Sequence, residues 1–259
     1  TLFGDDDWRA QPLVATGAFR SVSGRVEYDS RNSRRYPVEG WYASGTVQRG
    51  LGGSLVLPAL QLAPGVVIPA MDVDEEFTTG LVDVRRYNRA GREATLGLRV
   101  VAGGALAEET LPPQFQHALG GAGSLPGHDH FGIDCGARGL AGTIANGDGT
   151  GQVFQRGYGC DRFALFQAEY RGGIDLEIEL FDHSLSPHRD RGVDLDLGWS
   201  VFFVVGPGWT YAGSARGDTG VRYDAGFGLL FGDLGVYWAI PLERGERRPN
   251  FFIRLGPRF

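Results

Sequence analysis

Apolar and other side chains alternate over the last ten residues of the chain, NFFIRLGPRF. Successive side chains of an extended strand point to opposite faces, so this alternation predicts a strand with one fully apolar face. The opposite face carries two arginines and a glycine. The apolar face holds Phe251, Ile253, Leu255, Pro257 and Phe259.

The same alternation recurs upstream, with acidic, glycine or arginine residues between the apolar positions. It predicts about ten strands of roughly 8–13 residues, close to the length that a tilted strand needs to cross a bilayer. No segment has the spacing of an amphipathic helix. The clearest strand segments are 94–102, 173–181, 193–203, 221–229 and 233–240, and further candidates are 18–30, 40–49, 76–88 and 161–171.

Short and long connections alternate between these strands, which is typical of outer-membrane barrels with short periplasmic turns and long extracellular loops. The predicted tight turns are 86–91, 171–173 and 231–233, and the long connections are 50–75, 105–160, 182–192 and 206–219. Aromatic residues near the strand ends would form interfacial girdles. They are Trp41, Tyr42, Tyr170, Trp209, Tyr211, Tyr237 and Trp238.

A soluble β-sandwich would also show alternating strands. Two features favour a membrane barrel instead. Acidic side chains occupy whole strand faces, as at Asp175, Glu177 and Glu179, which suits a wet lumen opposite a lipid face. The predicted strands are also longer than the usual 5–6 residues of soluble sheets. We therefore predict an all-β, antiparallel transmembrane β-barrel, with about ten strands in this chain.

Composition excludes one class of partner. The 259 residues include 25 arginines, no lysine and 31 acidic residues, so the net charge is -6 and nucleic-acid binding is not expected. The 42 glycines are assigned to turns and close backbone packing. No run of about 18 apolar residues exists, so the sequence predicts no transmembrane helix.

Several stretches resemble the bacterial surface antigen barrels, which are the C-terminal domains of outer-membrane protein-assembly and translocation factors. The stretch VEYDSRNSRRYPVEGWYASGTV (26–47) resembles the Asp-x-Arg-Asn … Phe-Pro-x-x-Gly-Tyr strand–turn–strand of that family. Residues 82–106 resemble the next hairpin, 119–131 the lumen-plugging loop and 159–171 the strand after it. The ending from Tyr223 resembles the closing strands, so the resemblance covers residues 24–259.

The resemblance implies a barrel domain over residues 24–259, preceded by a segment, 1–23, that leads into the first strand. Within it, 105–160 is a long lumen and extracellular loop region. Family barrels usually have sixteen strands, and the matched motifs belong to their later part. About ten strands here imply either that upstream strands are missing or that the barrel is reduced. The periplasmic domains that precede such barrels are absent from this chain.

The activity implied by the resemblance is insertion of other barrels, or passage of polypeptide or lipid. It would use a weak seam between first and last strands that pairs with a client strand. The implied location is the outer membrane of a Gram-negative cell. Implied partners are outer-membrane lipids including lipopolysaccharide, the barrel-assembly machinery during biogenesis, and other outer-membrane or periplasmic subunits. Two other functions stay open: a non-transporting anchor or scaffold subunit, and a small passive pore.

Residues 119–131, here named the lumen loop, depart from the family pattern at two positions. The family has arginine where this chain has Pro126, and an aromatic residue where it has His128. That arginine typically pairs with an acidic residue on a lumen-facing strand, and the aligned position here is Val205. Loss of both partners together is coherent, because an unpaired buried charge is costly. The motif residues of the loop are Gly120, Gly121, Gly123, Ser124, Leu125, Pro126, Gly127 and His128.

Two cysteines, Cys135 and Cys160, flank a segment rich in Gly, Asn and Asp. In an oxidising compartment they would bridge its ends, and in the cytosol they would be free thiols. A Cys135–Cys160 disulfide is a candidate for holding the lumen loop where the family uses its arginine.

The final strand resembles the C-terminal signal by which the assembly machinery recognises new barrels. Phe251, Ile253, Leu255 and Phe259 fit this signal, whereas Pro257 stands where an aromatic residue is common. Proline lacks an N–H and suits an edge or seam position. An ordinary last strand requires the same alternation, so the two interpretations are compatible.

We predict no catalytic site, no cofactor and no metal. The chain lacks a Gly-x-Ser-x-Gly nucleophile motif, and GGAGSLPG lacks the Gly-Lys-Ser/Thr of a phosphate loop. His128 and His130 are weak metal-ligand candidates, because their spacing matches no established site. The NGDGTG stretch (146–151) lacks the further carboxylates of a calcium loop.

Overall fold

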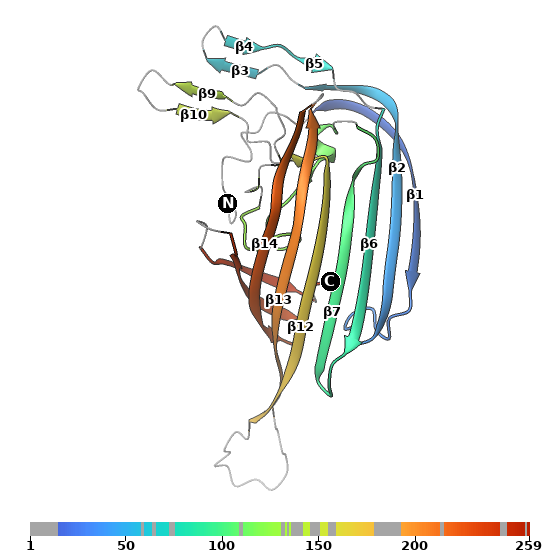
Figure 1. Ribbon diagram of the computed structural model, residues 1–259, viewed down its shortest axis with the longest axis vertical. Helices are drawn as coiled ribbons and strands as arrows, with labels where there is room; N and C mark the ends of the chain where they lie inside the picture. The colour runs from blue at the N-terminus through green and yellow to red at the C-terminus, as the bar shows by residue number, and fades with distance from the viewer. Residues whose placement is uncertain are drawn as a thin grey trace.

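The structure is a computed structural model, and its regular secondary structure is almost entirely antiparallel β (Figure 1). The residues that it describes are 15–57, 60–63, 66–72, 76–108, 111–130, 133, 135, 142–145, 151–154, 159–178, 193–212, 215–243, 248–256 and 258–259.

In the described part of the chain, ten strands form one antiparallel sheet. Nine of them follow the order β1-β2-β6-β7-β12-β13-β14-β15-β16, and the short strand β5 pairs with the end of β2. Long strands that follow one another in the chain are therefore neighbours in the sheet, which is the up-and-down arrangement of barrels. The bounds are β1 Thr16–Asp29, β2 Gly40–Leu57, β6 Thr78–Arg89, β7 Ala94–Ala105, β12 Arg162–Ile178, β13 Val193–Ala212, β14 Ala215–Phe231, β15 Leu234–Pro241 and β16 Asn250–Leu255.

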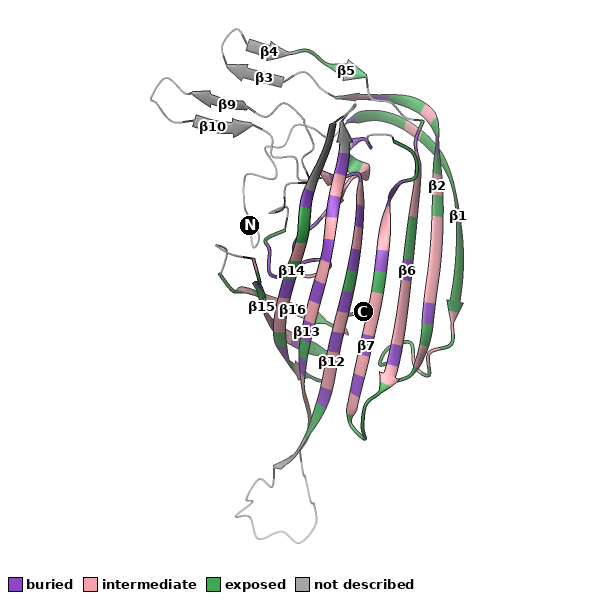
Figure 2. Ribbon diagram, viewed as in Figure 1, coloured by how far each residue is buried: buried purple, intermediate pink, exposed green. Residues whose placement is uncertain are grey.

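The strands have two different faces, and Figure 2 shows buried and more exposed residues alternating along them. On β12, Phe163, Leu165, Gln167 and Glu169 are buried, and the residues between them are more exposed. We call the buried side the inner face and the opposite side the outer face. The period-2 patterns of 94–102, 221–229 and 233–240 predicted these faces correctly.

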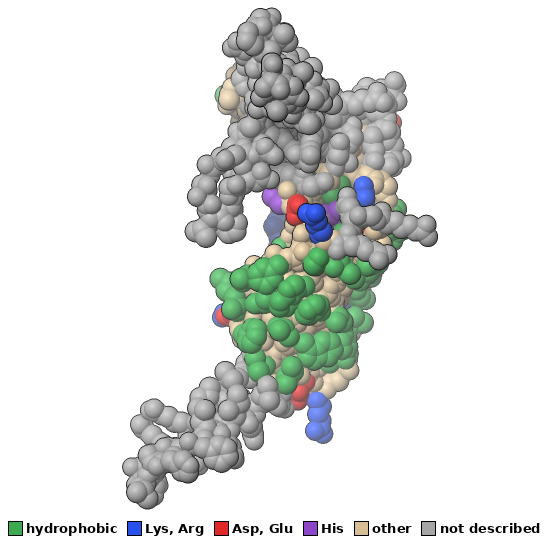
Figure 3. Space-filling model, turned by 90° about the vertical axis from the view of Figure 1, so that its left-hand side faces the viewer, with side chains coloured by type: hydrophobic (Ala, Val, Ile, Leu, Met, Phe, Trp, Pro, Cys, Tyr) green, Lys and Arg blue, Asp and Glu red, His purple; other side chains and the backbone are tan. Residues whose placement is uncertain are grey.

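The outer face is apolar. A space-filling view shows a band of hydrophobic side chains across it, with charged side chains above and below (Figure 3). The large hydrophobic residues exposed on strands β12 to β16 include Phe166, Ile174, Val201, Val221, Tyr223, Phe227, Leu229, Phe231, Leu234, Ile240, Phe251, Ile253 and Leu255. Two residues predicted for the girdle, Tyr42 and Tyr237, are instead buried on the inner face, at 8% and 1% exposure.

Shorter elements lie in the connections. They are β3 Leu60–Ala63, β4 Val66–Ile68, β5 Met71–Asp72, β8 His117–Ala118, β9 Gly142–Ala145, β10 Gly151–Phe154, β11 Gly159–Cys160 and the 3₁₀ turn η1 Pro113–Phe115. Within the described parts of the chain, no helix is long and apolar enough to cross a membrane.

The tight turn predicted at 171–173 is wrong, because β12 runs through it. Gly172 and Gly173 pair with Trp199 and Gly198 of β13. The indole of Trp199 lies over Gly172, where a Cβ atom would be 2.8 Å from the ring. Gly172 therefore makes room for an aromatic side chain within one long strand.

Other strand boundaries in the structure also differ from the predicted ones. The long connection predicted at 206–219 is wrong, since β13 runs to Ala212 and β14 starts at Ala215. A shift of register between Pro207 and Trp209 accommodates the proline within the ladder. The first part of 50–75 belongs to β2, and the turn predicted at 86–91 lies between Arg89 and Ala94. The acidic face predicted at Asp175, Glu177 and Glu179 lies outside the described side chains.

The sheet is strongly curved, and the part of the 105–160 connection that contains the lumen loop lies on its concave side (Figure 1). An apolar core forms there between the inner face and the lumen loop. It includes Val101, Leu119, Leu125, Ile133, Cys135, Cys160, Phe163, Leu165, Phe202, Val204, Tyr237 and Ala239. Among the described strands, β1 pairs only with β2 and β16 only with β15, so these two strands form the edges of the sheet.

Candidate functional site, the lumen loop

The tip of the lumen loop is buried in the concavity of the sheet. Leu125, Pro126, Gly127 and His128 are all buried, whereas Gly123 and Asp129 on either side are exposed. The loop thus inserts four consecutive residues between the strands, as expected for a loop that plugs a lumen.

The loop is a compact turn with its own hydrogen bonds. The Gly120 amide donates to the Ser124 hydroxyl at 3.0 Å, and that hydroxyl donates back to the Gly120 carbonyl at 2.9 Å. The Gly121 amide donates to the His128 carbonyl at 2.8 Å, which closes the turn. Gly120 has a φ of 105°, and a Cβ there would lie 2.2 Å from the Asp129 carbonyl oxygen, so the turn requires glycine.

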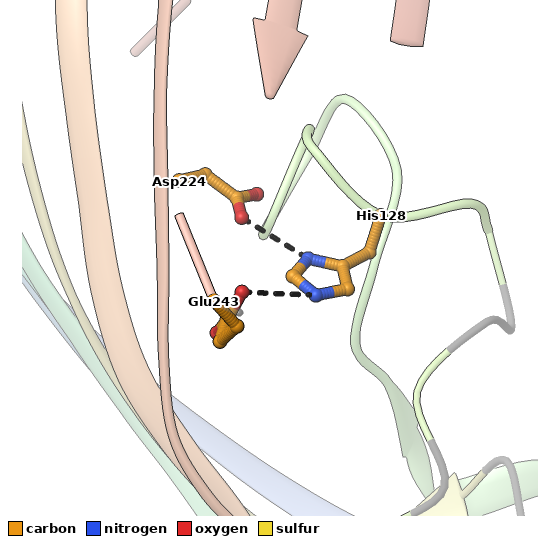
Figure 4. Close-up of side chains that lie close together, drawn as sticks. All are labelled: His128, Asp224 and Glu243. Atoms are coloured by element: carbon orange, nitrogen blue, oxygen red, sulfur yellow. Dashed lines mark ion pairs between the residues drawn. The ribbon is translucent and has the colours of Figure 1, made fainter. Parts of the chain in front are cut away.

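His128 points from the loop toward two carboxylates that come from far along the chain (Figure 4). Its Nδ1 lies 3.0 Å from Oδ1 of Asp224 on β14, and its Nε2 lies 3.6 Å from Oε2 of Glu243 after β15. Asp224 is fully buried, and the Glu243 side chain is 18% exposed. When His128 carries a proton on both nitrogens, each nitrogen faces one carboxylate, so the cluster links the loop to the strand wall.

Asp224 also accepts a hydrogen bond from the backbone of the loop. The Gly127 amide donates to Asp224 Oδ2 at 2.6 Å, so one carboxylate contacts two consecutive loop residues. Gly127 lies so close to the wall that a Cβ would be 2.6 Å from the Pro241 nitrogen and 2.7 Å from the Ile240 carbonyl carbon. Only glycine permits this approach of loop backbone to strand backbone.

Two more strands hold the loop by side-chain amides. Gln167 on β12 donates to the Ser124 carbonyl at 3.1 Å, and Asn250 on β16 donates to the Gly127 carbonyl at 3.0 Å. Arg99 on β7 donates in turn to the Gln167 side chain at 3.1 Å. The loop is therefore bonded to β12, β14 and β16, which spreads its anchorage across half of the sheet.

The base of the connection is fixed by a disulfide. Cys135 and Cys160 are joined, with Cα atoms 5.1 Å apart, as predicted for an oxidising compartment. Both sulfurs pack against β13 at Gly208, where a Cβ would be 2.6 Å from Cys160 Sγ and 3.1 Å from Cys135 Sγ. Leu119 covers the same glycine. The disulfide thus adds covalent linkage at the inner wall.

Asp161 organises the first part of the connection. This fully buried carboxylate accepts hydrogen bonds from the Leu111 amide at 2.9 Å and the Gln116 side chain at 3.1 Å, and from the hydroxyl of Thr210 on β13. Nearby, His117 packs its ring on Phe163, with centroids 4.7 Å apart. Burial lowers the pKa of His117, although the charge of Asp161 acts in the opposite direction.

The structure corrects the prediction that the loop has lost its acidic partner. Val205, the position aligned with that acid, points to the outer face, and the inner-face residue beside it is Val204. Asp224 lies directly opposite Val204 on the neighbouring strand β14. An acid therefore faces the loop from one strand further along, and His128 contacts it, where the resemblance implies an arginine contact.

The two weak metal-ligand candidates lie in different surroundings, since His128 is buried and His130 is exposed. His130 lies against Gly121, where a Cβ would be 3.1 Å from its Nδ1. His128 instead converges with Asp224 and Glu243, which offer nitrogen and oxygen ligand atoms within 4.8 Å of one another. Among the residues that the structure describes, these three form the group that could hold a metal ion, and the sequence analysis named neither acid. One signal was present, because Asp224 is the single acid on the inner side of 221–229.

The final strand keeps most of its predicted pattern. Phe251, Ile253 and Leu255 lie on the outer face, at 56%, 60% and 78% exposure. The prediction that Phe259 shares this face is wrong. The strand ends at Leu255, Gly256 has a φ of 82°, and Phe259 is buried against Gly97 on the inner side.

Comparison with known proteins supports the fold. No protein-family model matches the chain, and no curated protein has a similar sequence. Among solved structures, the chain is similar to the crystal structure of BamA from Haemophilus ducreyi lacking POTRA domains 1–3, with a TM-score of 0.58 and 17% sequence identity. The match covers 91% of this chain and 42% of the BamA chain. The predicted antiparallel β-barrel fold is thereby confirmed, with the chain spanning about two fifths of the length of that structure.

Proposed function

We propose that this chain is part of an outer-membrane β-barrel that assists the insertion of other barrels, or the passage of polypeptide or lipid. Three observations support the proposal: the BamA-like fold, the apolar band on the outer face, and the lumen loop docked inside. Its lipid partners are outer-membrane lipids, including lipopolysaccharide. The barrel-assembly machinery acts on it during biogenesis.

The observation that carries the proposal is that, among the described strands, the two edges of the sheet have no strand paired on their outer side. Unpaired N–H and C=O groups at a strand edge are a template for a strand from another chain. The 14 residues of β1 pair with β2 alone among the described strands. A client strand added to such an edge gains a ladder of hydrogen bonds before it closes its own barrel.

Alternate N–H groups of β1 point toward β2 and away from it. This alternation identifies a position at which a substitution would affect only the unpaired side of the strand. The Ser30 amide donates to the Trp41 carbonyl at 2.8 Å, and the β1–β2 register continues without shift from Asp29 back to Ser21. N–H directions alternate along an antiparallel strand, so the Ser23 amide points away from β2. Proline at position 23 would block the open edge and leave the ladder with β2 intact.

The experiment measures folding of a small urea-denatured barrel into phosphatidylcholine vesicles that contain this chain. We expect the chain to accelerate client folding, Ser23→Pro to abolish most of the acceleration, and Ser23→Ala to retain it. If the client folds at the same rate into vesicles with the unmodified chain as into empty vesicles, the insertion activity is rejected.

A second candidate, a non-transporting anchor or scaffold subunit, is favoured by how firmly the loop is fixed. Asp224, Gln167, Asn250 and the Cys135–Cys160 disulfide all restrain it. Copurification with fixed partners, together with no acceleration of client folding, would favour this role. A passive pore would instead show ion conductance that changes when the lumen loop is released.

A further inference from the structure

A cavity of about 330 Å³ on the concave side of the sheet is lined mainly by arginine. Its walls come from the β1–β2 connection, from β6 and β7, from the lumen loop at Gly123 and from the end of the chain. The arginines that line it are Arg31, Arg34, Arg85, Arg99, Arg254 and Arg258.

Four of these arginines have acidic partners. Arg31 and Arg34 lie 2.9 and 3.4 Å from Asp29, and Arg85 and Arg99 lie 2.7 and 2.8 Å from Asp83. Each carboxylate therefore serves two guanidinium groups. Arg85 and Arg99 are also directly opposite each other in the β6–β7 ladder, a placement of like charges that costs stability unless an anion lies between them.

The other two arginines, Arg254 and Arg258, form no ion pair with any residue that the structure describes. Arg258 is only 4% exposed, and its Nε and Nη1 have no hydrogen-bond acceptor among the described groups. Its guanidinium lies 3.5 Å over the ring of Phe202. Burial lowers the pKa of Arg258 to about 10, so the side chain still carries its charge at pH 7.

Six guanidinium groups thus line a small cavity, and among the described residues only two carboxylates form ion pairs with them. The acid that acts most strongly on Arg258 is Glu169. Six guanidinium groups against the four carboxylates of Asp29, Asp83, Glu169 and Asp224 leave positive charge in excess. A buried charge with unsatisfied N–H groups is costly, and an anion in the cavity would satisfy both the charge and the donors. Guanidinium groups bind phosphate oxygens in pairs, which suits several arginines that converge from different walls.

From this geometry we propose that the cavity binds a small multivalent phosphate anion, either free or as the phosphorylated headgroup of a lipid. Arg254 and Arg258 are its principal donors, and Arg31, Arg85 and Arg99 add charge around it. No residue of β1, the edge strand tested for client insertion, lines the cavity, so either proposal can fail alone.

The test is calorimetric titration of the folded chain in dodecyl maltoside micelles with pyrophosphate. We expect saturable binding, weakened at least about tenfold in Arg254→Gln and Arg258→Gln, because each removes a charge-assisted donor. Far-UV circular dichroism checks folding, and Arg254→Gln keeps the test valid if the buried Arg258 variant does not fold. Arg25→Gln is the matched control, since Arg25 pairs with Glu27 on exposed β1 and does not line the cavity.

A second arm distinguishes the two sources of phosphate. Micelles doped with phosphatidic acid should compete with pyrophosphate if the ligand is a lipid headgroup, and should leave its affinity unchanged if the ligand is free. Absence of saturable binding would overturn the proposal. So would an equal loss of affinity in Arg25→Gln, because it would show attraction to net charge alone.

Discussion

The amide of Gly127 donates a 2.6 Å hydrogen bond to the carboxylate of Asp224, a residue 97 positions away in the sequence. The same carboxylate faces the imidazole of His128 at 3.0 Å. One buried acid thereby holds two neighbouring residues of the lumen loop against the sheet. This relationship replaces the arginine contact that the family resemblance implies, and the stability of the loop should depend on it.

Asp224 and His128 should be energetically coupled. Asp224→Asn and His128→Gln should each destabilise the folded chain by about 1–3 kcal/mol, because each leaves a buried polar partner poorly satisfied. The double variant should lose less than the sum, with a coupling of about 0.5–3 kcal/mol. Urea unfolding in detergent micelles measures the free energy of unfolding of the unmodified chain, the two single variants and the double variant. Strict additivity would mean that the two side chains do not interact.

Substitution by alanine should release the loop at one of its glycines and have no effect at another. Gly127→Ala places a methyl group against the backbone of β15 and should release the loop, because that backbone cannot move aside easily. Gly123→Ala should be neutral, since a Cβ there has no atom within 4 Å. Limited proteolysis of the folded chain measures release as faster cleavage between residues 119 and 131. Equal cleavage of the two variants would contradict the docked position of the loop.

The sequence predicted the faces of the strands better than the identity of the loop's partner. Alternation placed Tyr223 and Phe227 on the outer face because a one-residue slip would expose every buried side chain. The partner was assigned to Val205 by linear alignment, but which residues of two strands lie side by side depends on register. Asp224 comes to face the loop because it pairs with Val204, and no local pattern encodes that pairing.

The sequence also predicted the positions of chain reversals poorly, because a glycine can either turn the chain or make room for a neighbouring side chain within a strand. Gly172 and Gly173 looked like a turn but lie within β12, where Trp199 fills the space above Gly172. Gly256 looked like a strand residue but turns the chain, and Phe259 is consequently buried. Only tertiary contacts separate these cases.

The Cys135–Cys160 disulfide should stabilise the chain by about 3 kcal/mol, as expected for closure of a loop of 25 residues. A Cys135→Ser, Cys160→Ser double variant should show a lower Tm than the oxidised chain. Added reductant should lower the Tm of the original chain to that of the variant and leave the variant unchanged. A Tm that does not respond to reductant in either protein would show that the bridge adds no stability.

His117 should make stability fall in mild acid. Because burial lowers its pKa in the folded state, the unfolded chain binds this proton more readily. The stability contribution is complete above the unfolded pKa of about 6.5 and is lost as the pH falls through that value toward the folded pKa. His117→Gln should flatten this part of the profile of unfolding free energy against pH. An unchanged slope in His117→Gln would assign the acid sensitivity to other groups.

A single substitution on the outer face separates a lipid-facing barrel from a water-soluble sheet. Val201 is 47% exposed on β13, with the outer-face neighbours Tyr170 and Phe227 opposite it on the two adjacent strands. If this face contacts lipid, Val201→Arg should cost about 2–4 kcal/mol near the bilayer centre. If the face contacts water, the arginine should be tolerated within about 0.5 kcal/mol, as at ordinary surface sites. Val201→Ala controls for the loss of the valine side chain. The measurement is the folded fraction in phosphatidylcholine vesicles over a range of urea concentrations, and equal midpoints for the arginine and alanine variants would contradict the membrane location.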